Sequence, residues 1–420
     1  MNATTDRLLV DFLREGPDAG PREGLERALA ATHRVGQRPG WATTERWSSM
    51  DIVMQRTPSS RPFLLLATIA VLIALLATAA LLVGSQNRLP EPFGLARNGQ
   101  IAYAADAGLL VADGPGLAPH VLVPGLIAEG SAAFSQQGDR LAYVLQDAGG
   151  LDLIVARADG TDPRVLVHDF DGFGGASWSP DGTKIVLAST EAGATQLTIL
   201  NADGSGSQVV GGAGRADFPA WRPGGRQIAF RSQQFDGTSA VFLAEADGSN
   251  TRRLDLTNAT VSEGSYGALR WSPDGSRLLY MGMNAGANDV GWRIHVVDVD
   301  ADGGVVDHAM RFVPGSTNEV LPVWAPDGRR LAFNLEHDGQ RQIAITEPVD
   351  GAPVTLIGPT ILSTVGGLGH QWSPDGRTLL ITVWPRGGEA ATWSVDAETR
   401  AATELDGPPI DLAAWQRLAP

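Results

Sequence analysis

The 420-residue chain carries 32 lysine and arginine residues against 47 aspartate and glutamate residues, a formal net charge of −15. This acidic balance disfavours nucleic-acid backbones as ligands and favours cationic or basic partners. Because the chain has no cysteine, disulfides, thiolate metal sites and a cysteine nucleophile are excluded.

The first 62 residues contain two apolar stripes at helical spacing. They cover residues 8–13 and 25–32 and are bounded by glycine or proline, which predicts two short amphipathic helices. These helices are too small to bury a stable core alone. They serve as a flexible anchor tail, lie at the membrane surface with Trp41 and Trp47, or hold a cytoplasmic regulator. In that last role the segment would resemble the cytoplasmic modules of membrane-bound anti-sigma factors, although it lacks their His-and-Cys motif.

An apolar run follows this segment. From Phe63 to Val83 only Thr68 and Thr78 carry hydrogen-bonding side chains, and a helix of this length covers the ~30 Å of a bilayer core. We therefore predict one transmembrane helix over residues 63–84 and a linker over residues 85–93. Three arginines closely precede the helix and two follow it, so we expect the N-terminus in the cytoplasm and the rest of the chain outside. The predominance of arginine over lysine indicates a bacterial source, so we expect the membrane to be a bacterial cell membrane.

From residue 94 onward the sequence repeats. Its mark is Trp-Ser-Pro-Asp-Gly, and in every copy an apolar strand begins seven residues after the aromatic residue. Proline presets φ, aspartate hydrogen-bonds locally and glycine takes the left-handed position, so each copy predicts a hairpin turn. The copies occupy residues 134–138, 178–182, 221–225, 271–275, 324–328 and 372–376.

A second Asp-Gly turn later in most units, as at Asp159-Gly160, gives four strands per unit. Such a repeat predicts an all-β fold, a β-propeller. Seven second strands are legible, and they begin at Ile101, Leu141, Ile185, Ile228, Leu278, Leu331 and Leu379. The strand missing before Ile101 is found at Leu412–Trp415. The two ends of residues 94–420 are therefore expected to complete one sheet in a closed ring of seven blades, with six or eight as the alternatives.

The repeated Trp-Ser-Pro-Asp-Gly turn with its short apolar strand resembles the TolB-type propeller family over residues 94–420. A propeller of this kind implies a fold more than an activity, since such rings host binding, scaffolding and catalysis. We expect its repeat aromatics to form a core between blades and not a ligand cage. They are Phe134, Trp178, Trp221, Trp271, Trp324, Trp372 and Trp415.

The Asp-Gly turns are short and uniform, so their face is predicted to be structural. The opposite face varies in length, as in the expected loop from Met281 to Arg293, and we place recognition there. Candidate rim residues precede an innermost strand or lie in these loops. They are Asp169, Asp171, Arg215, Asp217, Glu263, Tyr266, Trp292, Arg293, Glu319, His337, His370 and Trp384.

Metal binding and catalysis find little support in the motifs. Asp298, Asp300 and Asp302 resemble the first half of a calcium loop, but Ala309 stands where a bidentate glutamate is required. No nucleophile elbow, P-loop or zincin motif occurs in the sequence. We also expect no hydrolase domain like the one that follows the propeller in prolyl-oligopeptidase-like enzymes. The histidines are scattered, unlike the clustered ligands of polysaccharide-lyase propellers. We expect no cofactor.

The sequence thus predicts a membrane-anchored, extracytoplasmic propeller that binds or scaffolds a protein or another envelope ligand by recognition and not by chemistry. The alternative is a transmembrane sensor whose residues 1–62 hold a cytoplasmic regulator. A metal-dependent lyase is the third reading.

Overall fold

The computed structural model describes residues 93–419 apart from 129, 148, 171–175, 192–193, 211–213, 235–237, 257–268, 287–288, 301, 303, 311, 314–315, 317, 363–365, 386–387 and 411–412. The two N-terminal helices, the transmembrane helix over residues 63–84 and the linker predicted above lie outside the described residues. Within the described part, no helix has the length and apolar character to cross a membrane.

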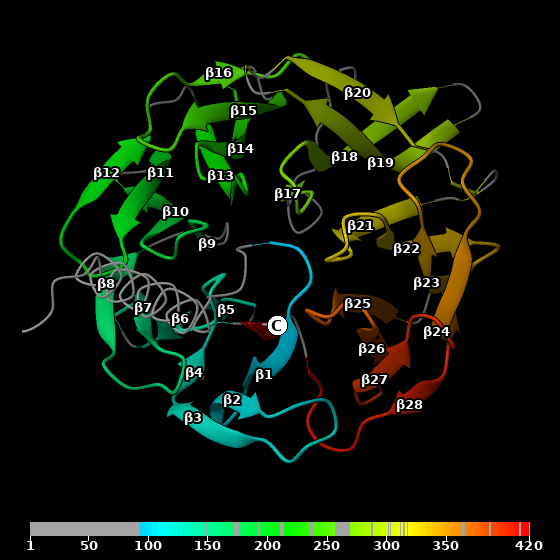
Figure 1. Ribbon diagram of the computed structural model, residues 1–420, viewed down its shortest axis with the longest axis horizontal. Helices are drawn as coiled ribbons and strands as arrows, with labels where there is room; N and C mark the ends of the chain where they lie inside the picture. Colours follow the sequence, from blue (N-terminus) through cyan, green and yellow to red (C-terminus); the bar gives the residue numbers. More distant parts are fainter. Residues whose placement is uncertain are drawn as a thin grey trace, which may run out of the picture. The chain divides into compact units, whose positions relative to one another are not determined.

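The described strands form seven antiparallel sheets arranged as the blades of one ring (Figure 1). Blade 1 consists of β29 (Ala414–Leu418), β1 (Arg97–Ala105), β2 (Gly108–Ala112) and β3 (His120–Pro124). Blade 2 consists of β4 (Leu126–Ile127), β5 (Ala133–Phe134), β6 (Arg140–Gln146), β7 (Leu151–Arg157) and β8 (Arg164–Phe170). In blade 2 both β4 and β5 pair with β6, so its innermost strand is split in two.

The remaining five blades each contain four strands in chain order. Blade 3 consists of β9 (Ala176–Trp178), β10 (Lys184–Glu191), β11 (Ala194–Asn201) and β12 (Ser207–Val210). Blade 4 consists of β13 (Arg215–Trp221), β14 (Gln227–Gln233), β15 (Ser239–Glu245) and β16 (Arg252–Arg253). Blade 5 consists of β17 (Arg270–Trp271), β18 (Arg277–Gly286), β19 (Asp289–Val299) and β20 (Val305–Ala309). Blade 6 consists of β21 (Asn318–Trp324), β22 (Leu331–His337), β23 (Gln340–Thr346) and β24 (Thr355–Leu362). Blade 7 consists of β25 (Gly366–Trp372), β26 (Thr378–Pro385), β27 (Ala391–Asp396) and β28 (Ala402–Glu404).

The ring is closed by the C-terminal strand, as the sequence predicted. β29 pairs with β1 so that Trp415 lies opposite Ile101 and Ala414 opposite Ala102, and Figure 1 shows the two strands side by side in blade 1. The paired strand runs over Ala414–Leu418, so it begins two residues later and ends three residues later than expected. Closure gives the first and last strands of the ring a common sheet and removes two open edges.

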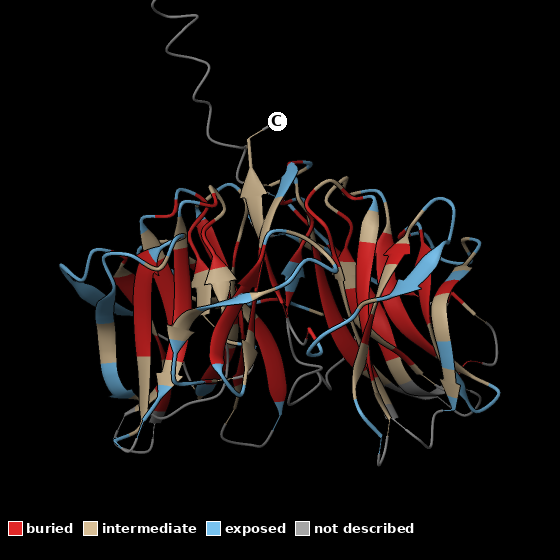
Figure 2. Cartoon of the chain, turned by 90° about the horizontal axis from the view of Figure 1, so that it is seen from below, coloured by how far each residue is buried: buried red, intermediate tan, exposed pale blue. Residues whose placement is uncertain are grey.

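The hydrophobic core lies between the blades and not within them. The buried apolar side chains fall into seven clusters, each made by two neighbouring blades. Each repeat aromatic is buried and belongs to a different cluster; for example, Trp221 of blade 4 packs on Val186 and Ile199 of blade 3. Figure 2 shows the result, with buried strands inside the ring and exposed residues on its outer strands and loops.

The turn after each repeat aromatic has the geometry that its residues predict. In the copy of blade 3, Gly182 has φ of 66°, the left-handed region that glycine adopts without strain. The Asp181 carboxylate accepts hydrogen bonds from the hydroxyl of Ser179 at 2.6 Å and the backbone N–H of Thr183 at 3.0 Å. Partial burial alone would raise the pKa of Asp181, but these hydrogen bonds outweigh it and hold the pKa below its usual value. The ionised carboxylate therefore fastens the turn.

Candidate functional site

The face that carries these turns, here called the turn face, holds neighbouring blades together through arginine side chains. Arg277 of blade 5 lies over the Trp324 ring of blade 6, with 4.7 Å between its guanidinium carbon and the ring centroid. Its Nη2 also donates to the carbonyl oxygen of Gly328 at 3.2 Å. Arg330 of blade 6 repeats both contacts on Trp372 and Gly376 of blade 7. We call this arrangement an arginine clip, because one guanidinium binds both an aromatic ring and a turn carbonyl of the next blade.

Blade 4 makes the same clip with a residue from another position. Its strand begins with Gln227 where Arg277 and Arg330 stand in their units, and Arg222 from the preceding turn takes over. The Arg222 guanidinium carbon lies 4.8 Å from the Trp271 ring centroid. Its Nε donates to the Gly275 carbonyl at 2.7 Å, and Nη1 donates to the Gln227 side chain at 2.7 Å. Three successive junctions are thus closed by a guanidinium.

At the junction of blades 3 and 4 the corresponding residue is Lys184, the only lysine of the chain. Among the described residues the Lys184 ammonium group makes no hydrogen bond, ion pair or aromatic contact. A cavity of about 560 Å³ opens there, within the range of typical ligand pockets. Its lining residues are Gln137, Ser179, Pro180, Asp181, Lys184, Trp221, Pro223, Gly224, Gly225, Arg226 and Ala246.

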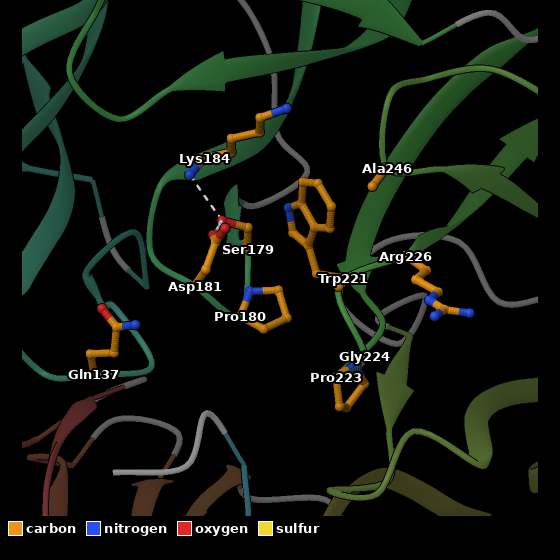
Figure 3. Close-up of a pocket in the computed structure, with 11 residues that line it drawn as sticks. Gln137, Ser179, Pro180, Asp181, Lys184, Trp221, Pro223, Gly224, Arg226 and Ala246 are labelled. Atoms are coloured by element: carbon orange, nitrogen blue, oxygen red, sulfur yellow. Dashed lines mark hydrogen bonds between the residues drawn. The ribbon is translucent and has the colours of Figure 1, made fainter. Parts of the chain in front are cut away.

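Figure 3 shows how the lining side chains of this cavity lie. Lys184 and Arg226 stand on different sides of the Trp221 ring, and Arg226 extends away from the ring in this view. Pro180 and Pro223 come from the two turns that flank the cavity. Arg226 is exposed although it lines the cavity; the indole, the two prolines and the turn backbone line the cavity beside it. The cavity is therefore formed by two adjacent copies of the repeat.

A second cavity of about 570 Å³ lies on the turn face beside blades 2 and 3. Its lining residues are Gly138, Asp139, Arg140, Val155, Ala156, Arg157, Ala158, Asp159, Asp162, Arg164, Ala202, Asp203 and Gln416. Four aspartates and three arginines line this cavity, so its surface carries charges of both signs and does not favour a ligand of one charge. Gln416 closes its blade 1 side by donating to the Gly138 carbonyl at 2.7 Å. Sequence reasoning assigned the turn face a structural role and missed both cavities.

The rim residues predicted from sequence do not form one surface. Asp217 of β13 and Arg231 of β14 form a buried ion pair, with Nε of Arg231 donating to the carboxylate at 2.7 Å. Arg215 at the start of β13 is exposed. Asp169 is also exposed, but it lies in β8, the outer strand of blade 2, and not ahead of an inner strand.

Two further rim residues hold the connector between blades 5 and 6. Glu319 is fully buried and accepts hydrogen bonds from the Val313 backbone N–H and the Ser316 hydroxyl, both at 3.0 Å. Arg293 is 1% exposed and donates to the Ser316 carbonyl at 3.2 Å. Burial raises the pKa of Glu319, and the hydrogen bonds and the Arg293 charge oppose that rise. These two side chains are thus occupied with packing the connector.

The predicted loop from Met281 to Arg293 was wrong. It is the tip of a long hairpin in which β18 and β19 stay paired, with Met281 opposite Ile294 and Gly282 opposite Arg293. Continued pairing satisfies backbone N–H and C=O groups that a loop would leave to water. Trp292 therefore lies in a strand, where it is partly buried against the core of blades 5 and 6.

The remaining described rim residues belong to blades 6 and 7. His337 ends β22, and its Nε2 lies 3.3 Å from the Asp338 carboxylate. His370 lies in the inner strand β25; both ring nitrogens are buried without a well-formed hydrogen bond to a described residue. Burial lowers the pKa of His370 to about 4, a shift that an interaction with the backbone of Ala332 opposes. Trp384 of β26 packs on Gly369 so closely that a Cβ there would lie 2.6 Å from its ring.

Asp171, Glu263 and Tyr266 lie outside the described residues. None of the nine described rim residues lines either cavity. Asp298 and Asp300 fasten their hairpin, since Asp300 accepts from the Gly304 N–H at 2.7 Å and Asp298 lies 3.3 Å from His308. Among the described residues no three His, Asp or Glu side chains gather as they would around a metal ion. This finding includes the calcium candidate Asp302.

The chain belongs to the TolB β-propeller family. The model of the TolB beta propeller domain matches residues 97–306, which is half of the chain and contains β1 to β19 and the first two residues of β20.

Two curated relatives and one solved structure are similar to this chain. An uncharacterized protein of Agrobacterium fabrum is 27% identical over 135 residues, which cover 30% of this chain and 42% of the relative. An uncharacterized peptidase of Bacillus subtilis, YuxL, is 30% identical over 142 residues, which cover 33% of this chain and 19% of the relative. The chain thus spans less than half the length of these relatives. A prolyl endopeptidase structure matches with a TM-score of 0.56 and 17% identity, over 80% of this chain and 54% of that chain, and this likeness shows a common fold.

Proposed function

We propose that the chain is a binding or scaffolding module whose propeller holds a protein partner on its turn face. The observation that carries this proposal is the cavity of about 560 Å³ between blades 3 and 4, built from two copies of a turn that is closed by an arginine clip elsewhere. The net charge of −15 supports a basic partner surface. A closed ring also presents such a cavity with little reorganisation on binding, which lowers the entropic cost of association.

Site-specific photo-crosslinking in cells tests this proposal and the choice of face. One probe replaces Arg226 on the turn face, a second replaces His337 on the opposite face, and a third replaces the exposed Val165 on an outer strand. We expect one defined protein adduct from position 226 alone. An adduct from position 337 alone would move recognition to the loop face, and no adduct from any position would contradict the binding proposal.

In this proposal residues 63–84 anchor the chain in a bacterial membrane and the propeller lies outside the cytoplasm. The support is the uncharged run from Phe63 to Val83 and the arginines that precede it. Protease added to intact spheroplasts is expected to digest the propeller, and alkaline carbonate is expected to leave the chain in the membrane fraction. A protected propeller or a carbonate-extracted chain would contradict this topology.

A sensor is the second candidate, because two apolar stripes precede the apolar run. It requires that the full chain recover a defined cytoplasmic protein that a chain without residues 1–62 does not recover. If both chains recover the same proteins, the result contradicts the sensor proposal and leaves the scaffold proposal in place.

The similarity to peptidase YuxL and to a prolyl endopeptidase motivates a direct assay for hydrolysis. Under the binding proposal, purified full chain leaves a fluorogenic peptide library intact and carries no stoichiometric metal. Hydrolysis that co-purifies with the chain would favour a peptidase, and bound metal would favour the lyase reading.

A further inference from the structure

The junction of blades 4 and 5 shows what a complete clip contains. The Arg222 guanidinium stacks on Trp271 at 4.8 Å and donates to three backbone carbonyls of blade 5. The two shortest bonds join Nε to Gly275 in the turn after the tryptophan and Nη2 to Val299 at the end of β19, both at 2.7 Å. The third joins Nη1 to Asp300 at 3.0 Å. An indole ring and two carbonyls in this arrangement match the face and the fork of a guanidinium.

Blade 4 presents the same three groups to blade 3. Trp221 is its repeat tryptophan, Gly225 its turn glycine, and Ala246 the residue that follows β15. The equivalence of the last two follows from backbone hydrogen bonds. Gly225 and Gly275 each donate at 2.8 Å to the residue after their tryptophan, and Ala246 and Val299 each donate at 2.8 Å to the residue after their turn glycine.

These three residues line the cavity of about 560 Å³, and no side chain of blade 3 binds them as Arg222 binds blade 5. Among the described residues, neither the Gly225 nor the Ala246 carbonyl accepts a hydrogen bond. Resting on the binding role proposed above, we infer that this cavity is a socket for an arginine side chain of a partner polypeptide, which completes the clip that Lys184 leaves open.

The carboxylates near the socket are compatible with a bound cation. The ammonium of Lys184 acts on the Asp247 carboxylate, whose pKa is lowered first by hydrogen bonds from Ser249 and then by that positive charge. Asp181 also lines the cavity, and its pKa is held below the usual value, so it is ionised at neutral pH. Arg226 lines the cavity but is exposed and extends away from the Trp221 ring (Figure 3). The competing reading is an anion bound by Lys184 and Arg226, and the experiment separates the two.

Ligand-observed NMR titrations of the full chain in detergent test the socket. The probe is acetyl-Gly-Arg-Gly-amide, and its control contains citrulline, which keeps the shape of arginine and loses the charge. We expect saturable binding of the arginine peptide and at least tenfold weaker binding of the citrulline peptide. Equal binding of both peptides, or binding of neither, would overturn the inference.

Variants then locate the binding. Lys184→Arg fills the socket with the chain's own guanidinium and is expected to weaken peptide binding at least tenfold, while the exposed Arg329→Lys leaves it unchanged. Arg330→Lys opens a second socket between blades 6 and 7 and is expected to double the stoichiometry. Lys184→Gln and Arg226→Gln leave the indole and the two carbonyls in place and are expected to bind the arginine peptide as the unchanged chain does. If the wild-type chain binds inorganic phosphate and these two variants do not, the cavity is an anion-binding site and the inference is wrong.

The inference and the proposed function fail separately. If Lys184→Arg protein still gives the crosslinked adduct from position 226, the partner binds the turn face without the socket. If the arginine peptide binds but no adduct forms in cells, the socket exists and the scaffold role falls.

Discussion

The turn face of the propeller has a clipped part and an open part. From blade 4 to blade 7, arginine clips made by Arg222, Arg277 and Arg330 close each junction. From blade 2 to blade 4, no arginine lies over a tryptophan among the described residues, and the two cavities open there. The apolar clusters are present at all seven junctions. The repeat core therefore holds the ring at every junction, whereas the presence or absence of an arginine that reaches the next blade decides where the turn face is closed.

The largest loss of stability is expected when the repeat tryptophan is removed, either at a clipped junction or at the open one. Trp324→Ala and Trp221→Ala each remove a buried indole, at a cost of about 3–5 kcal/mol. Trp324→Ala also removes the stacking of Arg277, which is expected to add roughly 0.5–2 kcal/mol. Urea unfolding of both variants measures the difference. If Trp221→Ala costs more than Trp324→Ala, the clips do not contribute to stability as we describe.

The next effect is a pH dependence in the clipped part, at His370. Its pKa is about 4 in the folded protein and 6.5 as an ordinary histidine. The unfolded state therefore binds a proton between these values that the folded state does not, and stability falls as pH drops from 6.5 toward 4, by about 3 kcal/mol in total. Unfolding at pH 7 and pH 4.5 measures this loss.

A matched pair of variants isolates that histidine. His370→Leu is expected to reduce the loss of stability between pH 7 and pH 4.5, while His120→Gln, at an exposed position of β3, retains it. An unchanged pH dependence in His370→Leu would assign the effect to other groups.

Removing the clips themselves is expected to have a smaller effect. Arg330→Ala loses the contact with Trp372, the hydrogen bond to Gly376 and the ion pair with Asp327, about 1–2 kcal/mol together. Lys184→Ala at the open junction loses none of these and is expected to change stability by less than about 0.5 kcal/mol. Equal losses in the two variants, measured by thermal unfolding, would erase the distinction between the clipped and open parts.

Much of the fold could be predicted because its causes are local and repeated. The glycine of each Pro-Asp-Gly turn, the apolar strand after it and the partner of Ile101 at the C-terminus follow from short-range rules and from counting. The blade number therefore follows without any knowledge of contacts between blades.

The candidate site could not be predicted in the same way. In blade 4 the clip is made by Arg222 and not by the residue at position 227, and at Lys184 the junction stays open. Both features depend on which side chain reaches across a junction, and only the packed ring determines that. Glu319 illustrates the opposite error, since a charged residue before an inner strand suggested a rim and proved fully buried. A signal did exist in the sequence. The sixth residue after the aromatic is arginine in three units, at Arg140, Arg277 and Arg330, and lysine in one.

The smallest expected effect is also the one that joins the two parts of the turn face. Lys184→Arg places a guanidinium at the position that Arg277 and Arg330 hold in their units, beside Trp221 and the Gly225 turn, so the open junction is expected to gain a clip. The gain is expected to be about 0.5–1 kcal/mol, because a planar guanidinium can stack on the indole and donate to the turn carbonyl, whereas the Lys184 ammonium makes neither contact among the described residues. Thermal unfolding is expected to shift upward by roughly 1–3 °C, with Arg329→Lys as the control without a shift. The guanidinium introduced at position 184 would both stabilise the junction and occupy the socket, so this variant has to gain stability and lose binding of the arginine peptide together. A gain of stability without loss of peptide binding, or loss of peptide binding without a gain of stability, would show that the cavity and the clip are not the same site.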